Sequence, residues 1–125
     1  MTTAAFIAGF GAIGCLARYY LSGWVYAQFG RAFPYGTFVV NILGAFCIGL
    51  LMEFSLRSTL ISANVRLGLT IGLLGGLTTF STFSYETYQL LEDGQFLAAF
   101  SNAAASVMVC LALTWAGIQV ARQIA

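Results

Sequence analysis

The chain has 125 residues, of which 60% are hydrophobic and 7% are charged, and its net charge is +1. A water-soluble domain carries roughly a quarter charged residues, so this composition excludes a soluble protein and predicts an integral membrane protein. The five basic residues form no patch and histidine is absent, which argues against nucleic-acid binding and removes the usual proton shuttle and the commonest metal ligand.

Four apolar segments follow one another along the chain, separated by short polar connections. Each is long enough for a membrane-spanning helix, which needs about 20 mostly apolar residues. We therefore predict an all-α membrane protein with a single four-helix transmembrane domain over residues 1–125. The expected transmembrane helices lie at approximately 3–29, 35–54, 64–91 and 95–121.

The orientation of these helices in the membrane is weakly specified. With four spans, both termini and the second connection share one side, which carries Arg57, Arg66 and Arg122. The opposite side carries Arg31. This small excess is a weak signal under the positive-inside rule. Insertion in both orientations and a fixed orientation with cytoplasmic termini are therefore both open at this point.

The first segment contains a glycine motif and one charge. The run Gly9 to Gly14 has the spacing of a dinucleotide-binding loop, but no strand precedes it and no acidic residue follows at the required distance. We interpret these glycines as a helix-packing face. Arg18 is the one basic residue within an apolar run, where a charge is costly unless it is paired or hydrated. It is either an anchor that reaches the interface or a positive charge that attracts anions to a pathway.

The second segment places Thr37 and Asn41 one helical turn apart, so that the two polar side chains share a face of the helix. The amide of Asn41 offers two hydrogen-bond donors in the middle of an apolar run. An interhelical hydrogen bond and a polar stripe along a pathway are both consistent with this position.

The third segment contains the most informative stretch of the chain. Its double glycine, Gly75 and Gly76, weakens a helix. Irregular backbone at membrane depth is tolerated only where protein or a water-filled cavity covers it. We therefore predict a break in the third helix that lines a small polar pathway with the hydroxyls of Thr78, Thr79, Ser81, Thr82 and Ser84.

Two aromatic rings accompany these hydroxyls. Phe80 and Phe83 share a helix face because they are three residues apart, and the positively polarised edges of their rings can face an anion. Ordinary aromatic packing is the alternative. Unwound backbone at Gly75 and Thr78 would free carbonyls that can coordinate Na⁺, unless neighbouring hydroxyls satisfy those carbonyls.

Two further polar positions are candidates for a pathway. Glu86, near the end of the third segment, is a proton-binding carboxylate, a vestibule charge or an interfacial residue. In the fourth segment Ser106 lies one turn from both Asn102 and Cys110, which gives either a thin polar stripe or incidental packing. The chain contains no recognisable nucleophile–base pair or metal-ligand spacing, so we predict that it is not an enzyme.

Three runs of the sequence together resemble the Fluc family of fluoride channels, also called the camphor-resistance family. The third run is highly specific, and the order, the spacing and the four-helix length extend the resemblance over essentially the whole chain. The runs are GAIGCLARY at 11–19, GTFVVN at 36–41 and GLLGGLTTFSTF at 72–83.

The resemblance implies a passive fluoride-selective channel, a multi-pass protein of the prokaryotic plasma (inner) membrane that exports fluoride from the cytoplasm. It also implies an antiparallel, dual-topology homodimer with two pores along its interface. A structural Na⁺ at the centre of the dimer would be held by the backbone carbonyls of Gly75 and Thr78. The implied partners are fluoride, a second copy of the chain and the lipid bilayer, with no nucleic acid. The implied fluoride pathway comprises Asn41, Phe80, Phe83, Thr37, Ser81, Thr82 and Ser106, with Arg18 and Glu86 at its vestibules.

Two other functions fit parts of the sequence. A proton-coupled exporter like the small multidrug resistance proteins is also a short four-helix protein, but it needs a carboxylate deep in the membrane, typically in the first helix. The first segment of this chain has no acid, and Glu86 is only a weak candidate for that role. A non-transporting assembly subunit would explain the glycines but not the hydroxyls near the predicted break.

Overall fold

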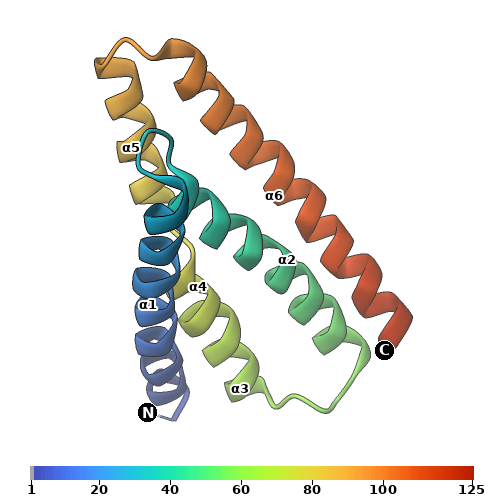
Figure 1. The fold of residues 1–125 in the computed structure, drawn as a ribbon. Helices are drawn as coiled ribbons and strands as arrows, with labels where there is room; N and C mark the ends of the chain where they lie inside the picture. Colours follow the sequence, from blue (N-terminus) through green and yellow to red (C-terminus); the bar gives the residue numbers. More distant parts are fainter. Residues whose placement is uncertain (1) are drawn as a thin grey trace.

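The computed structural model describes residues 2–125 and consists of helices joined by short connections (Figure 1). Four helical stretches are long and apolar enough to cross a membrane, the third of them running from α3 to α5 over Ala63–Glu92. The prediction of an all-helical, multi-pass membrane protein is therefore confirmed. The elements are α1 (Thr2–Phe29), α2 (Tyr35–Arg57), α3 (Ala63–Leu67), the π-helix η1 (Gly68–Leu74), α4 (Gly75–Leu77), α5 (Phe80–Glu92) and α6 (Phe96–Ile124).

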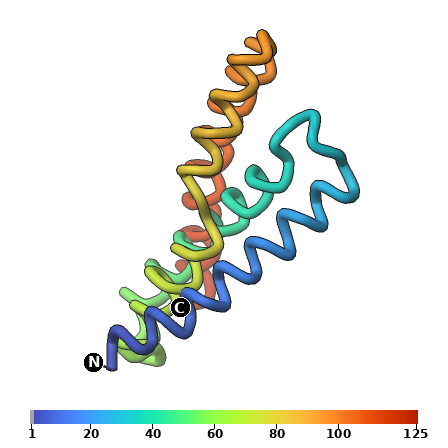
Figure 2. The backbone as a smooth tube through the Cα atoms, turned by 90° about the vertical axis from the view of Figure 1, so that its left-hand side faces the viewer, coloured from blue at the N-terminus to red at the C-terminus, as the bar shows by residue number. Residues whose placement is uncertain are grey.

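The helices pack as two pairs. α2 lies along α6 over most of its length, and α1 packs against η1 and α4 (Figure 1). α5 continues the third span on the other side of a two-residue link and contacts α6. The turn that joins α1 to α2 and the turn that joins α5 to α6 lie toward the same end of the molecule and diverge there (Figure 2). This divergence places the polar residues of α1, α2 and α5 around a shared opening, described below.

Glycines allow the backbones of α1 and the third span to approach closely. A Cβ added to Gly14 would lie 2.2 Å from the carbonyl oxygen of Leu73, and one added to Gly76 would lie 2.8 Å from the carbonyl oxygen of Gly11. Gly72 is similarly confined by the Ile7 carbonyl. Gly72 and Gly76, which lie one turn apart on the third span, therefore serve packing within this chain. Close van der Waals contact between helix backbones is what drives helix association in lipid, where apolar burial provides no driving force.

A second close contact joins α2 to α6. A Cβ on Gly49 would lie 2.2 Å from the carbonyl oxygen of Thr114, and a Cβ on Gly117 would lie 2.2 Å from the carbonyl oxygen of Phe46. The Thr114 hydroxyl also donates to the Ala45 carbonyl at 3.0 Å. Because both helices contribute a glycine to the contact, their axes are fixed in register as well as in distance.

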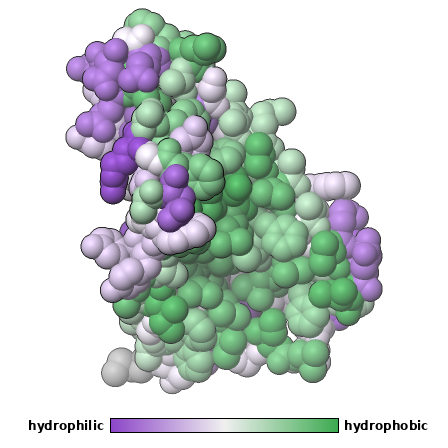
Figure 3. Space-filling model, viewed as in Figure 1, coloured by the Kyte–Doolittle hydropathy of each residue, from purple (hydrophilic) through white to green (hydrophobic). Residues whose placement is uncertain are grey.

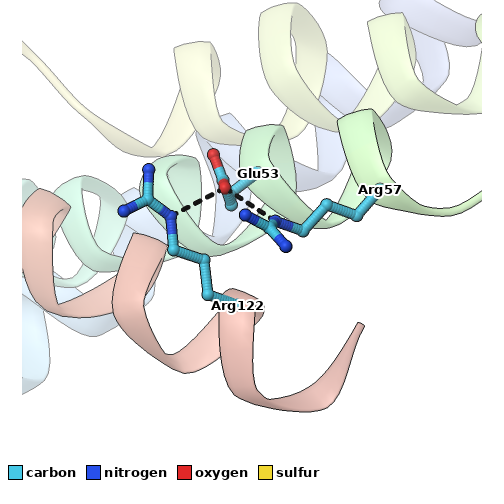
Figure 4. A network of polar contacts seen from close by, with 3 residues as sticks. All are labelled: Glu53, Arg57 and Arg122. Atoms are coloured by element: carbon cyan, nitrogen blue, oxygen red, sulfur yellow. Dashed lines mark hydrogen bonds and ion pairs between the residues drawn. The ribbon is translucent and has the colours of Figure 1, made fainter.

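An ion-pair cluster joins the C-terminal ends of α2 and α6 (Figure 4). Oε1 of Glu53 accepts from Nε of Arg57 at 2.8 Å and from Nε of Arg122 at 2.9 Å. Both arginine side chains are about half exposed, and solvent and salt screen such surface pairs. The cluster therefore specifies how the two helix ends meet more than it stabilises the fold.

The surface is dominated by apolar side chains. In the view of Figure 3, hydrophilic residues gather near the turn between α5 and α6 and at the ends of α2 and α6, and a broad hydrophobic face lies between them. The small buried cluster consists of Val40, Leu74 and Leu77. A fold with so little buried core is expected where lipid or another subunit covers the apolar faces.

These glycine contacts lead to a stability prediction. Gly117→Ala should lower the thermal stability of the purified protein in detergent, because the added methyl meets the rigid backbone of Phe46 and overpacking typically costs about 1–3 kcal/mol. The matched control is Gly23→Ala, a helical position where nothing lies within 4 Å of the added Cβ. Its stability should be unchanged or raised. Equal melting temperatures for the two variants would contradict the packing argument.

Candidate functional site

The third span is interrupted by a two-residue extended link. α4 ends at Leu77, and Thr78 and Thr79 then have φ/ψ values of −89°/155° and −151°/115° before α5 begins. The extended conformation suits β-branched threonine. The glycine pair at 75–76 itself remains helical within α4, so the interruption follows the glycines rather than coinciding with them.

The side chain of Asn41 on α2 is bonded to both backbone polar groups of the link. Its Nδ2 donates to the Thr79 carbonyl at 3.1 Å, and its Oδ1 accepts from the Thr79 N–H at 2.8 Å. The amide thus pairs with the extended residue as a neighbouring β-strand would. We call this reciprocal pair the Asn41–Thr79 clasp. Asn41 therefore makes a hydrogen bond between segments, one of the two roles that its position allowed, and keeps one N–H proton for another acceptor.

The link also changes the bonding of two nearby carbonyls. In a continuous α-helix the N–H of residue 79 would donate to the carbonyl of Gly75, but here it donates to Asn41. The N–H of Thr82 would donate to the carbonyl of Thr78, but it donates instead to Oγ1 of Thr79 at 3.1 Å. The carbonyls of Gly75 and Thr78 therefore lose the donors that a continuous helix would supply.

A cavity of about 510 Å³ lies beside this link, between α2, the third span and α6. Its lining combines rings, hydroxyls and one amide. The rings of Phe80 and Phe83 have centroids 5.4 Å apart and are tilted by 44°, and Phe80 is 77% exposed. We call it the phenylalanine cavity; its lining includes Asn41, Gly75, Thr78, Thr79, Phe80, Phe83, Ser106, Cys110 and Thr114.

A second cavity, of about 610 Å³, opens on the other side of the link. It contains two basic residues, Arg18 and Arg31, and one acid, Glu86. Thr79 lines both cavities, so the extended link lies between them. We call the second cavity the arginine cavity; its lining includes Arg18, Ser22, Tyr26, Arg31, Thr37, Thr79, Thr82, Tyr85 and Glu86.

The carboxylate of Glu86 is held by hydroxyls from two other helices. Tyr26 on α1 donates its hydroxyl to Oε2 at 2.5 Å, and Thr37 on α2 donates to Oε1. The backbone N–H of Thr37 in turn donates to the hydroxyl oxygen of Tyr26 at 3.4 Å. Across residues 2–125 the ion pairs are those of the Glu53 cluster, so neither arginine of the cavity is neutralised by direct contact with a carboxylate.

A buried polar network fastens α5 to α6 next to the phenylalanine cavity. Asn102 is 1% exposed, and its Nδ2 donates to Oγ1 of Thr87 at 2.8 Å. The hydroxyl of Ser106 approaches Oδ1 of Asn102 at 3.4 Å, and that of Thr87 donates to the Phe83 carbonyl at 2.7 Å. This network fixes the position of Ser106 relative to the Phe83 backbone.

The structure gathers most of the predicted site residues around the link. Ser81 is an exception among the described residues, because it is exposed and lines neither cavity; its hydroxyl lies 3.2 Å from Oγ1 of Thr79. Sequence reasoning did not single out Tyr26 or Arg31 for the site. The predicted residues divide between the cavities, with Asn41, Gly75, Thr78, Phe80, Phe83 and Ser106 at the first and Arg18, Thr37, Thr82 and Glu86 at the second.

Four apolar spans, an interrupted third span and two cavities lined in part by polar side chains define a multi-pass membrane protein with polar groups gathered around the interruption. Comparison with known families is more specific. The chain belongs to the CrcB-like protein family, Camphor Resistance (CrcB), which matches residues 5–118. The family resemblance predicted from the sequence is confirmed.

Close relatives cover nearly the full length of the chain. A protein named fluoride-specific ion channel FluC from Geotalea uraniireducens (strain Rf4) is 71% identical over 98% of this chain and 98% of its own length. A protein of the same name from Geotalea daltonii is 70% identical over 99% of this chain and its own full length, and one from Geobacter sulfurreducens is 65% identical over the same shares. These relatives are named as ion channels rather than enzymes, in agreement with the sequence-based prediction.

The Asn41–Thr79 clasp gives a second prediction. Asn41→Ala should accelerate hydrogen exchange across residues 78–82 and lower the thermal stability, because it leaves two backbone groups without partners at about 1–3 kcal/mol each. Asn41→Asp keeps the acceptor but removes the donor, so its exchange rate should be intermediate. Asn64→Ala is the control, since Oδ1 of Asn64 accepts from Thr3 elsewhere in the bundle. Unchanged exchange at 78–82 in Asn41→Ala would contradict the clasp.

Proposed function

We propose that the chain forms a passive fluoride-selective channel of the plasma membrane, the inner membrane of a prokaryotic cell, that exports fluoride from the cytoplasm. The names of its relatives support this assignment. The single structural observation that carries it is that the phenylalanine and arginine cavities meet at Thr79, on an extended link in the third span. Hydrogen fluoride enters cells as a neutral acid and dissociates inside, so the anion needs a polar route out.

The lining of the phenylalanine cavity suits a small, strongly hydrated anion. Such an ion gives up water only where several donors replace it together. In this proposal the spare N–H of Asn41 and the ring edges of Phe80 and Phe83, which line the cavity, face the ion, and the Ser106 hydroxyl turns to it from its long 3.4 Å bond to Oδ1 of Asn102. The described residues that line this cavity include no charged side chain. An ion without a full counter-charge can leave as readily as it enters, which conduction requires.

The site is completed by a second copy of the chain in this proposal. Phe80 is 77% exposed on the apolar surface, and a pathway lined by one chain lies open to lipid on that side. In an antiparallel, dual-topology homodimer each subunit would cover the open side of the other subunit's pathway. The dimer would then contain two equivalent pores related by a two-fold axis. The weak arginine bias between the two ends of the bundle supports insertion in both orientations.

The carbonyls of Gly75 and Thr78 fit a structural Na⁺ on that axis. Both residues line the phenylalanine cavity, and both carbonyls lack the donors of a continuous helix. Backbone carbonyls at helix interruptions are ligands that Na⁺ accepts within membranes. One chain offers two such oxygens and a two-fold related copy offers two more, so the ion would fasten the two subunits together.

Fluoride efflux from liposomes that contain the purified protein tests the channel function. We expect efflux driven by a K⁺/valinomycin potential, with no chloride leak and no need for a pH gradient, read with a fluoride electrode. No efflux from folded protein would contradict the proposal. Efflux that requires a pH gradient and is abolished in Glu86→Gln would favour a proton-coupled exporter instead.

Phe80→Ile tests the aromatic part of the pathway in the same assay. Fluoride efflux should fall several-fold, because an aromatic interaction contributes about 0.5–1.5 kcal/mol and each 1.4 kcal/mol is about tenfold in rate. Phe100→Ile is the matched control, since Phe100 is 69% exposed on α6 and lines neither cavity among the described residues. Equal efflux through both variants would remove Phe80 from the pathway.

The cation site makes a separate prediction. Na⁺ should raise the melting temperature and the dimer fraction of the purified protein relative to K⁺ at the same ionic strength, because a ligand that binds only the assembled state stabilises it by mass action. Thermal melts followed by size-exclusion chromatography measure both quantities. Identical behaviour in the two salts over a wide concentration range would contradict the Na⁺ site while leaving the channel proposal intact.

A further inference from the structure

Arg31 lines the arginine cavity but has no role in the pathway proposed above. Arg31 follows Gly30, whose φ of 82° turns the chain back after α1. The guanidinium carbon of Arg31 then lies 4.6 Å from the centroid of the Tyr26 ring. A cation over an aromatic face is held there by the quadrupole of the ring. The sequence places Arg31 in a turn, but the fold returns its charge to the lining of the cavity.

The charges around this cavity are arranged to leave a positive field at its opening. Arg18 and Arg31 both line it, and neither is in an ion pair with any carboxylate among residues 2–125. The one acid of the cavity, Glu86, has both its oxygens engaged by the hydroxyls of Tyr26 and Thr37. The cavity therefore contains two cations, Arg18 and Arg31, and one anion, Glu86, which is hydrogen-bonded to neutral hydroxyls and not to either arginine.

Tyr26 connects these opposite charges without letting them meet. Its ring face supports Arg31, and its hydroxyl donates to Glu86. An arginine in direct contact with the carboxylate would lose most of its field at short range. By separating the two groups, the tyrosine keeps the guanidinium charge available to solvent while satisfying the carboxylate.

We propose that Arg31, seated on Tyr26, is the anion-collecting residue at the mouth of the pathway. This inference rests on the proposed fluoride channel and names a residue that sets how efficiently the anion is captured. A charged group in a concave opening raises the local concentration of an oppositely charged solute and the rate of its capture, and the effect falls steeply as ionic strength rises. Arg31 acts on capture, whereas the passage itself lies beyond Thr79.

The test measures fluoride efflux from liposomes containing the full-length protein, over a range of fluoride concentrations and at two ionic strengths. Arg31→Gln should lower efflux at least threefold at low fluoride and low salt. The loss should largely disappear near 1 M of an impermeant salt, where the screening length is only about 3 Å. Efflux at saturating fluoride should stay at the wild-type level, because the passage is unaltered.

Three comparisons make the result specific to this position. Arg66→Gln removes the same charge from α3, outside both cavities, and should leave efflux at low fluoride unchanged. Arg31→Lys keeps the charge and should restore most of the capture. Tyr26→Phe keeps the ring under Arg31 but frees Oε2 of Glu86, while Thr37 still holds Oε1. Efflux at low fluoride should fall because the freed oxygen can then pair with an arginine.

The inference and the proposed function fail in different ways. If the wild-type protein conducts and Arg31→Gln matches Arg66→Gln at both ionic strengths, the role of Arg31 is overturned and the channel stands. A loss in Arg31→Gln that is equal at all fluoride and salt concentrations would also overturn the role, because it indicates a structural defect. Absence of efflux through folded wild-type protein would overturn the channel and this inference with it.

Discussion

The structure depends on one requirement of the bilayer interior, that every backbone polar group have a partner. An unpaired N–H or carbonyl away from water costs several kcal/mol, and an extended link in a membrane-spanning segment exposes such groups. The Asn41–Thr79 clasp meets this requirement for both backbone groups of Thr79 with a single side chain. The clasp also fixes where α5 begins, and thus where Phe80 and Phe83 project. The N–H of Thr79 donates to Asn41, and the N–H of Thr82 donates to the Thr79 hydroxyl. The carbonyls of Gly75 and Thr78 therefore lack the donors of a continuous helix.

An interrupted span needs neighbouring helices whose positions do not depend on the interruption. Close glycine contacts between helix backbones fix those positions. α1 meets η1 and α4 backbone to backbone, and α2 meets α6 in the same way on the opposite side. The wide turns of η1 are separated from the interruption only by the short helix α4, and π-helical turns are frequent at functional positions. The two rigid pairs leave α5 attached mainly to α6, through Asn102 and Thr87. The polar linings therefore lie where the bundle is least closely packed, between elements whose backbones are fixed.

The number of spans, their positions and the concentration of polar groups in the third span could be predicted from sequence, because bilayer thickness and hydrogen-bond satisfaction act on residue type alone. The place of the interruption could be predicted only in part, because the break was expected between Gly75 and Thr78 and the structure has it at Thr78 and Thr79. Glycine weakens a helix by only about 1 kcal/mol, and the close packing of Gly76 against Gly11 overrides that preference. The extended backbone falls instead on Thr78 and Thr79, where Asn41 is in reach. Two residues show that sequence alone does not decide which side chains line a cavity. Ser81 was predicted at the site but lies at the start of α5, outside both cavities. Arg31 was not predicted there, but the turn after Gly30 brings it into the lining of the arginine cavity.

In the proposed channel, attraction and passage are assigned to different cavities. A strong counter-charge beside the narrow part of a pathway would hold an anion too firmly to release it, whereas a pathway without any charge would capture a dilute anion slowly. This chain has two cations, Arg18 and Arg31, in the arginine cavity, whereas the polar groups that line the phenylalanine cavity are neutral. Thr79 lies between the two, and its backbone is already bonded to Asn41. An anion would thus exchange a diffuse electrostatic attraction for short hydrogen bonds beside a backbone segment that Asn41 already holds in place.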